Sequence, residues 1–372
     1  MADSVQKIPV FFHSSDEYSP FIAVTMASIL YNTNSFIEFY VIETGISDFH
    51  KRQIEKLSDN FSNFSIEWIR FEYNDIFKKE YFDSIRKENL HNPAWPGIHA
   101  FCTPFIPLLK PNLDKVIYLD LDVILLDDIK LLYDENLENK ALGVVPDIVC
   151  PLFVGEEQKS LNPKIKYGEF GRYFCAGVLL INSKKFREEN IIKRYFEIAG
   201  TEIVPVCDQD ILNRLCSEND CVFLDQKYDV IYQPKKEELQ AKGIDVLASV
   251  FTQAKENAVI RHFADVKPWT VSYMNWAKKT FFHCGDFWFF AKMTPFYEGI
   301  FNEYIQALQE DAVSKLVNKF SEVLEKSSAS KPSETSIIRY SFLGVPFFKV
   351  KKKNAVKKYY LFGVFHLFSI EE

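Results

Sequence analysis

The most constraining segment of this 372-residue chain is an apolar run that ends in two acids. Residues 115–123 read Lys-Val-Ile-Tyr-Leu-Asp-Leu-Asp-Val, a pattern typical of a buried β-strand. Side chains alternate between the faces of an extended segment, so Asp120 and Asp122 are expected to project the same way. Paired acids at the end of a buried strand are typical of the carboxyl edge of an open α/β sheet, where ligands bind.

Two carboxylates on one face form a site for a hard divalent cation. Mg²⁺ or Mn²⁺ would be held by oxygens of Asp120 and Asp122 and completed by phosphates and water. The alternative is a strand that merely ends in two solvated acids, which is the commoner origin of a bare Asp-x-Asp. The continuous apolar strand before the acids favours the metal site.

A second cluster lies at residues 259–269, which read Val-Ile-Arg-His-Phe-Ala-Asp-Val-Lys-Pro-Trp. A short apolar strand runs into His262, whose imidazole would complete the shell of the cation. Lys267 suits a phosphate oxygen. A histidine alone on an apolar strand is more often a core residue, but together with the two acids it indicates a metal–diphosphate site.

At these residues the chain resembles glycosyltransferase family 8, the retaining sugar transferases that include bacterial lipopolysaccharide glucosyl- and galactosyltransferases and glycogenin. Residues 9–18 are similar to the nucleotide-binding first strand and turn of the family. Residues 174–182 and 208–213 are similar to its two sugar-side segments. Each piece alone is a weak signal, whereas the joint order of the motifs is specific.

The resemblance implies an α/β fold of the GT-A type, with a Rossmann-like mixed sheet. It implies a retaining enzyme that uses Mn²⁺ or Mg²⁺ to move glucose or galactose from UDP-glucose or UDP-galactose. The acceptor would be a lipid-linked oligosaccharide, such as a lipopolysaccharide or lipooligosaccharide core. Asp120, Asp122 and His262 would hold the metal. Asp208 would bind sugar hydroxyls, and Gln209 would steady the oxocarbenium ion.

The resemblance also places further residues around the donor. Tyr18 would stack on the uracil, or else be the first core residue of a helix. Alternatively, Asp208 would be the N-cap of a helix, with Asp210 in its first turn. The expected substrate contacts, besides Tyr18 and the metal and catalytic residues, are Phe12, His13, Ser15, Thr103, Leu121, Asp147, Cys175, Ala176, Gly177 and Lys267.

The chain departs from the usual family pattern at a few positions. Thr103 stands where an Arg is usual, and Cys175 stands where an Asn precedes the Ala-Gly turn. Ser15 and Glu17 replace the common Asp and Asn of the uridine turn. The closing motif that begins at His262 lacks a Gly-Pro pair. These changes affect the surroundings of the donor more than the metal ligands.

Charge is distributed unevenly along the chain. Residues 336–372 carry seven basic residues and two acids, or +5, which leaves −12 for the remainder of a chain whose total is −7. The acidic body argues against nucleic acid as a partner, and the basic tail favours an anionic surface. Within the tail, Tyr-Ser-Phe-Leu-Gly-Val at 340–345 is echoed by Tyr-Tyr-Leu-Phe-Gly-Val at 359–364.

Lysines interleaved with aromatic residues are typical of a segment in a membrane interface. The alternative is a hairpin docked on the surface of the protein itself. No run reaches the length of a membrane span, the N-terminus lacks a secretion signal, and the seven cysteines are irregularly spaced. We therefore expect a cytoplasmic protein with reduced thiols, peripheral on the inner face of the cytoplasmic membrane.

Strands alternating with helices predict a mostly parallel sheet. Ser47 is expected to cap a helix over residues 47–57. We expect four regions along the chain: a nucleotide-sugar-binding catalytic domain at 1–275, a helical extension at 276–326, a linker at 327–336 and a membrane-associating tail at 337–372.

Two other classes of function remain open from the residues alone. One is a Mg²⁺-dependent phosphohydrolase with an aspartyl nucleophile, although residues 123–126 continue apolar where that chemistry usually has a Gly/Thr turn. The other is a non-catalytic membrane-surface protein that binds a sugar or nucleotide.

Overall fold

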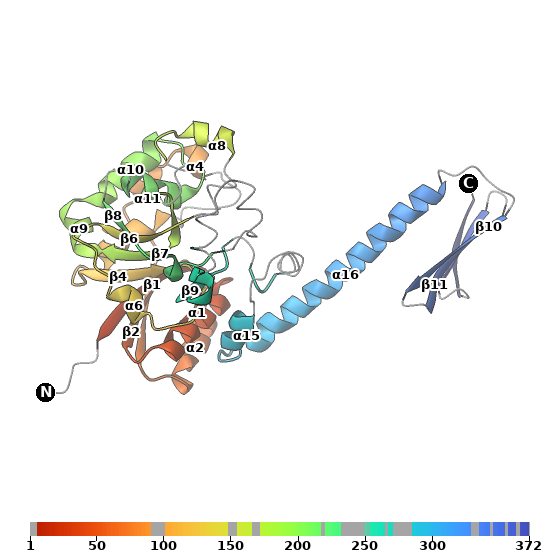
Figure 1. Cartoon of the computed structure of the whole chain (residues 1–372), viewed down its shortest axis with the longest axis horizontal. Coiled ribbons are helices and arrows are strands. Elements are labelled where there is room, and N and C mark those ends of the chain that lie inside the picture. The colour runs from red at the N-terminus through yellow and green to blue at the C-terminus, as the bar shows by residue number, and fades with distance from the viewer. Residues whose placement is uncertain are drawn as a thin grey trace. The chain divides into compact units, whose positions relative to one another are not determined.

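The computed structural model describes residues 6–90, 101–147, 155–165, 172–216, 220–231, 250, 253–264, 267–270, 285–328, 335–342, 345–353, 356–361 and 365–371. The chain divides into two compact units, Met1–Ile305 and Gln306–Glu372 (Figure 1). Among the helices that the structure describes, none is long and apolar enough to cross a membrane.

The central sheet of the first unit has seven strands: β1 (Lys7–Ser14), β2 (Phe36–Glu43), β3 (Phe64–Arg70), β4 (Lys115–Leu119), β6 (Leu142–Pro146), β7 (Phe174–Asn182) and β8 (Cys221–Phe223). Their order is β3-β2-β1-β4-β7-β6-β8. The first four neighbours run parallel, whereas β7 is antiparallel to both β4 and β6. The predicted mixed α/β sheet is therefore confirmed.

The helices of the first unit are short apart from α1, α10 and α11: α1 (Ser19–Asn32), α2 (Asp48–Glu55), α3 (Lys79–Asp83), α4 (Lys87–Leu90), α5 (Ile106–Leu109), α6 (Lys130–Tyr133), α8 (Glu156–Leu161), α9 (Ser183–Glu188), α10 (Ile191–Thr201), α11 (Cys207–Cys216) and α15 (Gly285–Ala291). Three 3-10 turns are η1 (Lys56–Asp59), η3 (Thr103–Phe105) and η4 (Gln226–Tyr228). The side chain of Ser47 caps α2 as predicted, accepting a hydrogen bond from the backbone of His50.

The core lies in two layers, one on each face of the sheet. In β1, Ile8, Val10 and Phe12 pack in the layer that contains α1, α2 and α15. Phe11 points the other way, into the layer that contains α10 and α11. Figure 1 shows helices on both sides of the strands. Because the central strands are buried on both faces, they read as continuous apolar runs, and polar groups gather at their ends.

Strand β4 covers Lys115–Leu119, so the apolar strand before the acids is confirmed, but its expected continuation through Asp120 and Asp122 is wrong. The chain turns at residues 120–122, and Val123–Leu125 forms a separate strand, β5, which pairs antiparallel with β9 (Ile260–His262). The chain leaves the sheet here because the backbone groups of β5 find their partners on β9 rather than on the neighbours of β4.

Helix α1 holds the other edge of β5. The hydroxyl of Thr25 lies 3.0 Å from the carbonyl oxygen of Leu121 and 2.9 Å from that of Val123, and it donates to both. The backbone N–H of Leu125 donates to the hydroxyl of Ser28 at 3.0 Å. Buried hydroxyls of a helix thus take the place of a neighbouring strand, and they fix the turn that carries the two acids.

The second unit consists of a helix followed by a small sheet. Helix α16 (Tyr297–Ser328) begins in the first unit and continues into the second. A four-stranded antiparallel sheet follows, in the order β10 (Thr335–Phe342), β11 (Val345–Lys353), β12 (Val356–Leu361) and β13 (Phe365–Glu371). The repeated motifs thus contain the ends of β10 and β12. β10 begins at Thr335, within the predicted linker, so the basic tail forms a sheet of its own.

A buried acid fastens the loop that follows β2. Glu43 is 2% exposed, and its carboxylate accepts hydrogen bonds from the backbone of Gly45 at 2.6 Å and of Ile46 at 2.9 Å. Lys51 and Arg70 contact the same carboxylate at 2.9 Å and 3.0 Å. Burial opposes the charge, but the hydrogen bonds from Lys51 and the two backbone groups outweigh it, so the pKa of Glu43 is lowered.

We predict that Glu43→Gln destabilises the first unit by about 2 kcal/mol at neutral pH, because charged hydrogen bonds inside the protein are lost. Since the pKa is depressed on folding, this stabilisation is present above the ordinary pKa of 4.5 and disappears as the pH falls through the lower pKa of the folded state. Urea unfolding followed by tryptophan fluorescence measures it, because all five tryptophans lie in the first unit.

The matched control is Glu67→Gln, which removes an exposed ion pair with Lys110 and should change the unfolding free energy by less than about 1 kcal/mol. Equal losses of unfolding free energy in the two variants at neutral pH would contradict a stabilising role of the Glu43 charge. A loss in Glu43→Gln that persists in acid would contradict it as well.

Candidate active site

The two acids of the turn are held by three neighbouring strands. The backbone N–H of Asp120 donates to the carbonyl oxygen of Gly177 on β7 at 2.8 Å, and the hydroxyl of Tyr118 donates to the Asp120 carboxylate at 2.9 Å. The carbonyl oxygen of Asp122 accepts from the backbone of Phe263, just after β9, at 2.8 Å. The turn is therefore tied to β4, β7 and β9 together.

His262 ends β9 and completes a three-residue cluster with the acids. Its ring is 2% exposed, and Nε2 lies 3.4 Å from a carboxylate oxygen of Asp122 and 3.9 Å from one of Asp120. One ligand atom from each of the three residues lies within 4.8 Å of the others. Two carboxylates and an imidazole suit Mn²⁺ or Mg²⁺, so the residues fit the expected cation.

A third acid, Asp229, fixes the orientation of the ring. Its side chain is fully buried, and one of its oxygens lies 3.0 Å from Nδ1 of His262. Hydrogen bonding at Nδ1 directs Nε2 toward Asp120 and Asp122. Burial opposes a charged ring, but the charges of Asp229 and Asp122 raise the pKa of His262 well above its ordinary value. A cation that binds here therefore has to displace a proton from Nε2.

Lys267 is drawn into the same cluster. Its ammonium contacts the carboxylate of Asp122 and donates to the carbonyl oxygen of Phe263 at 3.1 Å. Burial acts against the charge of Asp122, but Lys267 and His262 lower its pKa. Desolvation and the charge of Asp122 raise the pKa of Asp120. Lys267, expected to meet a phosphate, thus lies against Asp122, one of the two acids expected to hold the metal.

The position after Ala176 in strand β7 requires a glycine. A Cβ atom on Gly177 would lie 2.4 Å from Cε1 of His262 and 2.7 Å from a carboxylate oxygen of Asp120. Real Cβ atoms do not approach other atoms so closely, so any side chain here would displace the ring or the acid. Gly177 therefore leaves room for two of the three residues expected to hold the metal.

Gln209, in the first turn of α11, forms hydrogen bonds with three residues of the predicted sugar side. Its amide oxygen accepts from the backbone of Ala176 at 3.0 Å. Its amide nitrogen donates to Asp147 at 3.2 Å and to the hydroxyl of Tyr173 at 3.1 Å. Both ends of the amide are thus engaged, which fixes the orientation of the side chain.

Asp208 precedes Gln209, and its pKa is raised by burial and by the charge of Asp120. Burial, and then the charge of Asp120, raise the pKa of Asp208 to about 8. The carboxyl is therefore largely protonated at neutral pH and able to donate a hydrogen bond. The other acid of this turn, Asp210, is buried, and its carboxylate accepts a hydrogen bond from the backbone N–H of Val206, just before α11, at 2.7 Å.

The predicted nucleotide turn lies at the same edge of the sheet. Strand β1 is the parallel neighbour of β4, so Ser15 and Asp120 follow strands that end side by side. The Phe12 side chain is fully buried in the core, so only its backbone faces this edge. Tyr18 is 46% exposed, which excludes the alternative that it is a core residue of α1.

The remaining predicted residues occupy different surroundings. Thr103 opens η3 and is 6% exposed, so its side chain is largely covered. His13, near the end of β1, is partly buried. The side chain of Leu121 packs against the core layer of α1. Cys175 is buried, and its sulfur lies 3.8 Å from Nδ1 of His262.

Sequence reasoning missed Tyr118, Tyr173 and Asp229. Tyr118 precedes Asp120 by two residues, so strand alternation was a usable signal for it. Asp229 had no such signal, because it approaches His262 only through the pairing of Val230 with Arg261.

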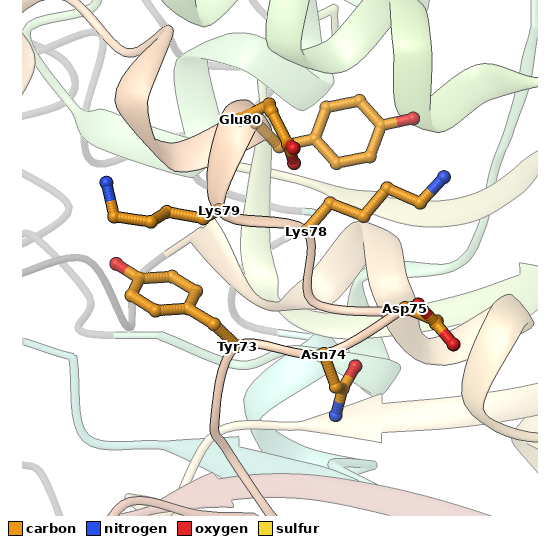
Figure 2. Close-up of a pocket in the computed structure, with 7 residues that line it drawn as sticks. Tyr73, Asn74, Asp75, Lys78, Lys79 and Glu80 are labelled. Atoms are coloured by element: carbon orange, nitrogen blue, oxygen red, sulfur yellow. The ribbon is translucent and has the colours of Figure 1, made fainter.

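A pocket of about 600 Å³ lies elsewhere in the first unit, on the segment that follows β3. Figure 2 shows its lining, which comes from residues 73–75 and 78–81. None of the predicted site residues contributes to it. This pocket is therefore separate from the cluster around His262.

Comparison with known proteins agrees with this arrangement. Residues 9–272 match the profile described as glycosyl transferase family 8. The chain is 25% identical over 217 residues to a putative glycosyltransferase of Haemophilus influenzae, covering 57% of this chain and 60% of that protein. It therefore spans less than two thirds of that relative. It is 25% identical over 255 residues to the lipopolysaccharide 1,2-glucosyltransferase of Escherichia coli K12, covering 67% and 68%.

The fold has a counterpart among solved structures. The crystal structure of the galactosyltransferase LgtC in complex with donor and acceptor sugar analogs superposes with a TM-score of 0.59 and 24% identity. The superposition covers 77% of this chain and 96% of that one. The expected GT-A fold is thereby confirmed, and the profile match extends over most of the chain. This chain belongs to glycosyltransferase family 8.

Proposed function

We propose that this protein is a metal-dependent retaining hexosyltransferase. It would move glucose or galactose from UDP-glucose or UDP-galactose to a lipid-linked oligosaccharide, such as a lipopolysaccharide or lipooligosaccharide core. The observation that carries the proposal is the convergence of Asp120, Asp122 and Nε2 of His262 beside the predicted nucleotide turn. The named activity of the E. coli relative supports the class of donor and acceptor.

Breaking the anomeric bond of a nucleotide sugar leaves negative charge on the diphosphate. Mn²⁺ or Mg²⁺ held by Asp120, Asp122 and His262 would act as a Lewis acid toward that charge. Lys267 adds a second positive charge at the same place. The two acids thus serve as electrostatic anchors, not as proton carriers.

The sugar would lie over the first turn of α11. Gln209 presents an amide whose orientation is fixed by Ala176, Asp147 and Tyr173, and it would stabilise positive charge at the anomeric carbon. Asp208, whose pKa is raised to about 8 by burial and by the charge of Asp120, would bind a sugar hydroxyl. Retention follows if the acceptor attacks from the face that the diphosphate leaves.

We predict that Asp122→Asn abolishes both Mn²⁺ binding and donor turnover. The loss should exceed about 100-fold, since even groups that only orient a ligand contribute 10- to 100-fold to metal affinity. Manganese binding is measured by electron paramagnetic resonance, and turnover by release of UDP from UDP-glucose and UDP-galactose. Asp127→Asn, at an exposed acid just beyond β5, is the matched control and should behave as wild type.

Full UDP release in the Asp122→Asn variant would contradict the metal role. Phosphate release from small phosphoesters, with no UDP release, would favour the phosphohydrolase. Tight binding of UDP without any turnover would favour the non-catalytic binding protein.

We predict that Gly177→Ala weakens Mn²⁺ binding by at least about tenfold, because the added methyl group displaces the buried ring of His262 or the carboxylate of Asp120. Gly285→Ala is the matched control, since a Cβ there meets nothing within 4 Å. Wild-type manganese affinity in Gly177→Ala would show that the ring position does not govern binding.

We further propose that the second unit holds the enzyme on an anionic membrane surface on the cytoplasmic side. In the small sheet Arg339 lies opposite Lys349, and Lys351 lies opposite Lys358. Residues opposite each other share a face, as do Lys349 and Lys351 along β11, so the four cations lie on one face. Directly opposed like charges destabilise a sheet unless anions accompany them.

The other face of the same sheet combines apolar residues with two opposed lysines, Lys352 and Lys357, of which Lys357 is 6% exposed. Val350 lies opposite Tyr359, and each is only 4% exposed. On the first face, Arg339, Lys351 and Lys358 are exposed. The cationic face of the sheet is therefore available to lipid headgroups. The cysteines at 102, 175, 207, 216 and 221 are free, which supports a reducing compartment.

We predict that K351E/K358E weakens binding to vesicles containing phosphatidylserine by roughly 30-fold or more, from about 1 kcal/mol for each lysine removed. The variant K315E/K319E makes the same change of net charge on helix α16 and should have a smaller effect. Co-sedimentation at low and high salt, with phosphatidylcholine vesicles as the uncharged reference, measures the difference. Equal sedimentation of the two variants would exclude the sheet face as the membrane contact.

A further inference from the structure

A second set of ligand atoms lies behind the ring of His262. The sulfur of Cys175 on β7 is 3.8 Å from Nδ1, and an oxygen of Asp229 is 3.0 Å from the same nitrogen. The exposed fractions of Cys175, Asp229 and His262 are 5%, 0% and 2%. One ligand atom from each lies within 4.8 Å of the others. None of these contacts involves Asp120 or Asp122.

The chemistry of this group differs from that of the acid pair. A thiolate, an imidazole and a carboxylate form a donor set for Zn²⁺, whereas Mn²⁺ and Mg²⁺ favour oxygen. In a tetrahedral zinc site with bonds of about 2.0–2.3 Å, ligand atoms lie about 3.3–3.6 Å apart. The two measured separations bracket that range, so a small adjustment of the side chains would close the site.

Two further observations concern the side chains of Asp229 and Cys175. The second oxygen of Asp229 is buried, and no hydrogen-bond partner for it exists in the part of the chain that the structure describes. A buried carboxylate oxygen without a donor is costly, and a positive ion would satisfy it. The backbone N–H of Gly177 donates to the sulfur of Cys175 at 3.4 Å, which fixes the position of the sulfur beside the ring of His262.

We propose that Cys175, Asp229 and Nδ1 of His262 form a second metal site, specific for Zn²⁺ or a similarly thiophilic ion, and that its occupancy excludes the cation at Asp120 and Asp122. The exclusion rests on the proposed function of the acid pair. A neutral imidazole has one lone pair. When Nδ1 binds zinc, Nε2 keeps its proton and faces Asp122 as a donor, so it no longer serves as a ligand there.

This arrangement makes zinc an inhibitor that acts from behind the catalytic site. Binding releases the thiol proton of Cys175 and the Nδ1 proton of His262, and no other bond changes. The thiolate and the carboxylate together neutralise the ion, so a buried site of this composition carries no net charge.

Cobalt(II) spectroscopy tests the thiol site directly. The chelator-treated full-length protein is titrated with Co²⁺, both as wild type and as Asp122→Asn, in which the acid pair is disabled. We expect a sulfur-to-cobalt charge-transfer band in the near ultraviolet in both proteins. The band should be lost in Cys175→Ser, retained in the control Cys216→Ser, and removed by stoichiometric Zn²⁺. Absence of the band in wild type and Asp122→Asn, or its persistence in Cys175→Ser, would overturn the site.

Manganese release tests the exclusion. Electron paramagnetic resonance of the Mn²⁺-loaded protein should show release of the ion on addition of Zn²⁺, and Cys175→Ser should require at least about tenfold more zinc. Equal zinc requirements would mean that zinc competes at Asp120 and Asp122 themselves, and the exclusion would be wrong. If wild type bound no Mn²⁺, the proposed function would fail, while the cobalt band in Asp122→Asn would still decide the thiol site.

Discussion

His262 lies between two groups of possible metal ligands, one formed by Asp120 and Asp122 and the other by Cys175 and Asp229. The carboxylate of Asp229 orients the ring and thereby fixes which nitrogen faces each group. With Asp229 at Nδ1, the ring turns Nε2 toward Asp120 and Asp122, where a hard cation is expected. Gly177 supplies the space in which the ring and Asp120 approach each other. The proposed leaving-group stabilisation and the proposed zinc inhibition are both consequences of the position of this one imidazole.

The position of the ring depends in turn on how two distant segments pair. Strand β5 leaves the main sheet to pair with β9, which brings His262 opposite Val123, directly after the two acids. Hydroxyls of Thr25 and Ser28 hold the free edge of β5, so that the turn is bounded on both sides. A site built on paired strands and a buried helix is rigid enough to fix ligand atoms before substrate arrives.

Local patterns in the sequence predicted much of this fold. Continuous apolar runs marked the central strands, and Ser47 marked the start of α2, because strand burial and helix capping depend on neighbouring residues. The strand expected through Asp122 was wrong, because alternation does not show where a strand leaves its sheet. Asp229 escaped notice for a related reason, since its contact with His262 depends on long-range pairing. The small sheet after Thr335 was also missed. The tail was interpreted from its content of lysines and aromatic residues, and not from the alternation of side chains that predicts strands.

The central claim is that Nε2 of His262, with Asp120 and Asp122, binds the catalytic cation while Asp229 holds Nδ1. Anomalous scattering from crystals grown with Mn²⁺ and UDP tests it most directly. We expect one manganese peak bonded to both acids and to Nε2, with the UDP diphosphate on its open side and Asp229 hydrogen-bonded to Nδ1. A peak that lacks His262 as a ligand, or a ring reversed so that Nδ1 faces the acids, would contradict it.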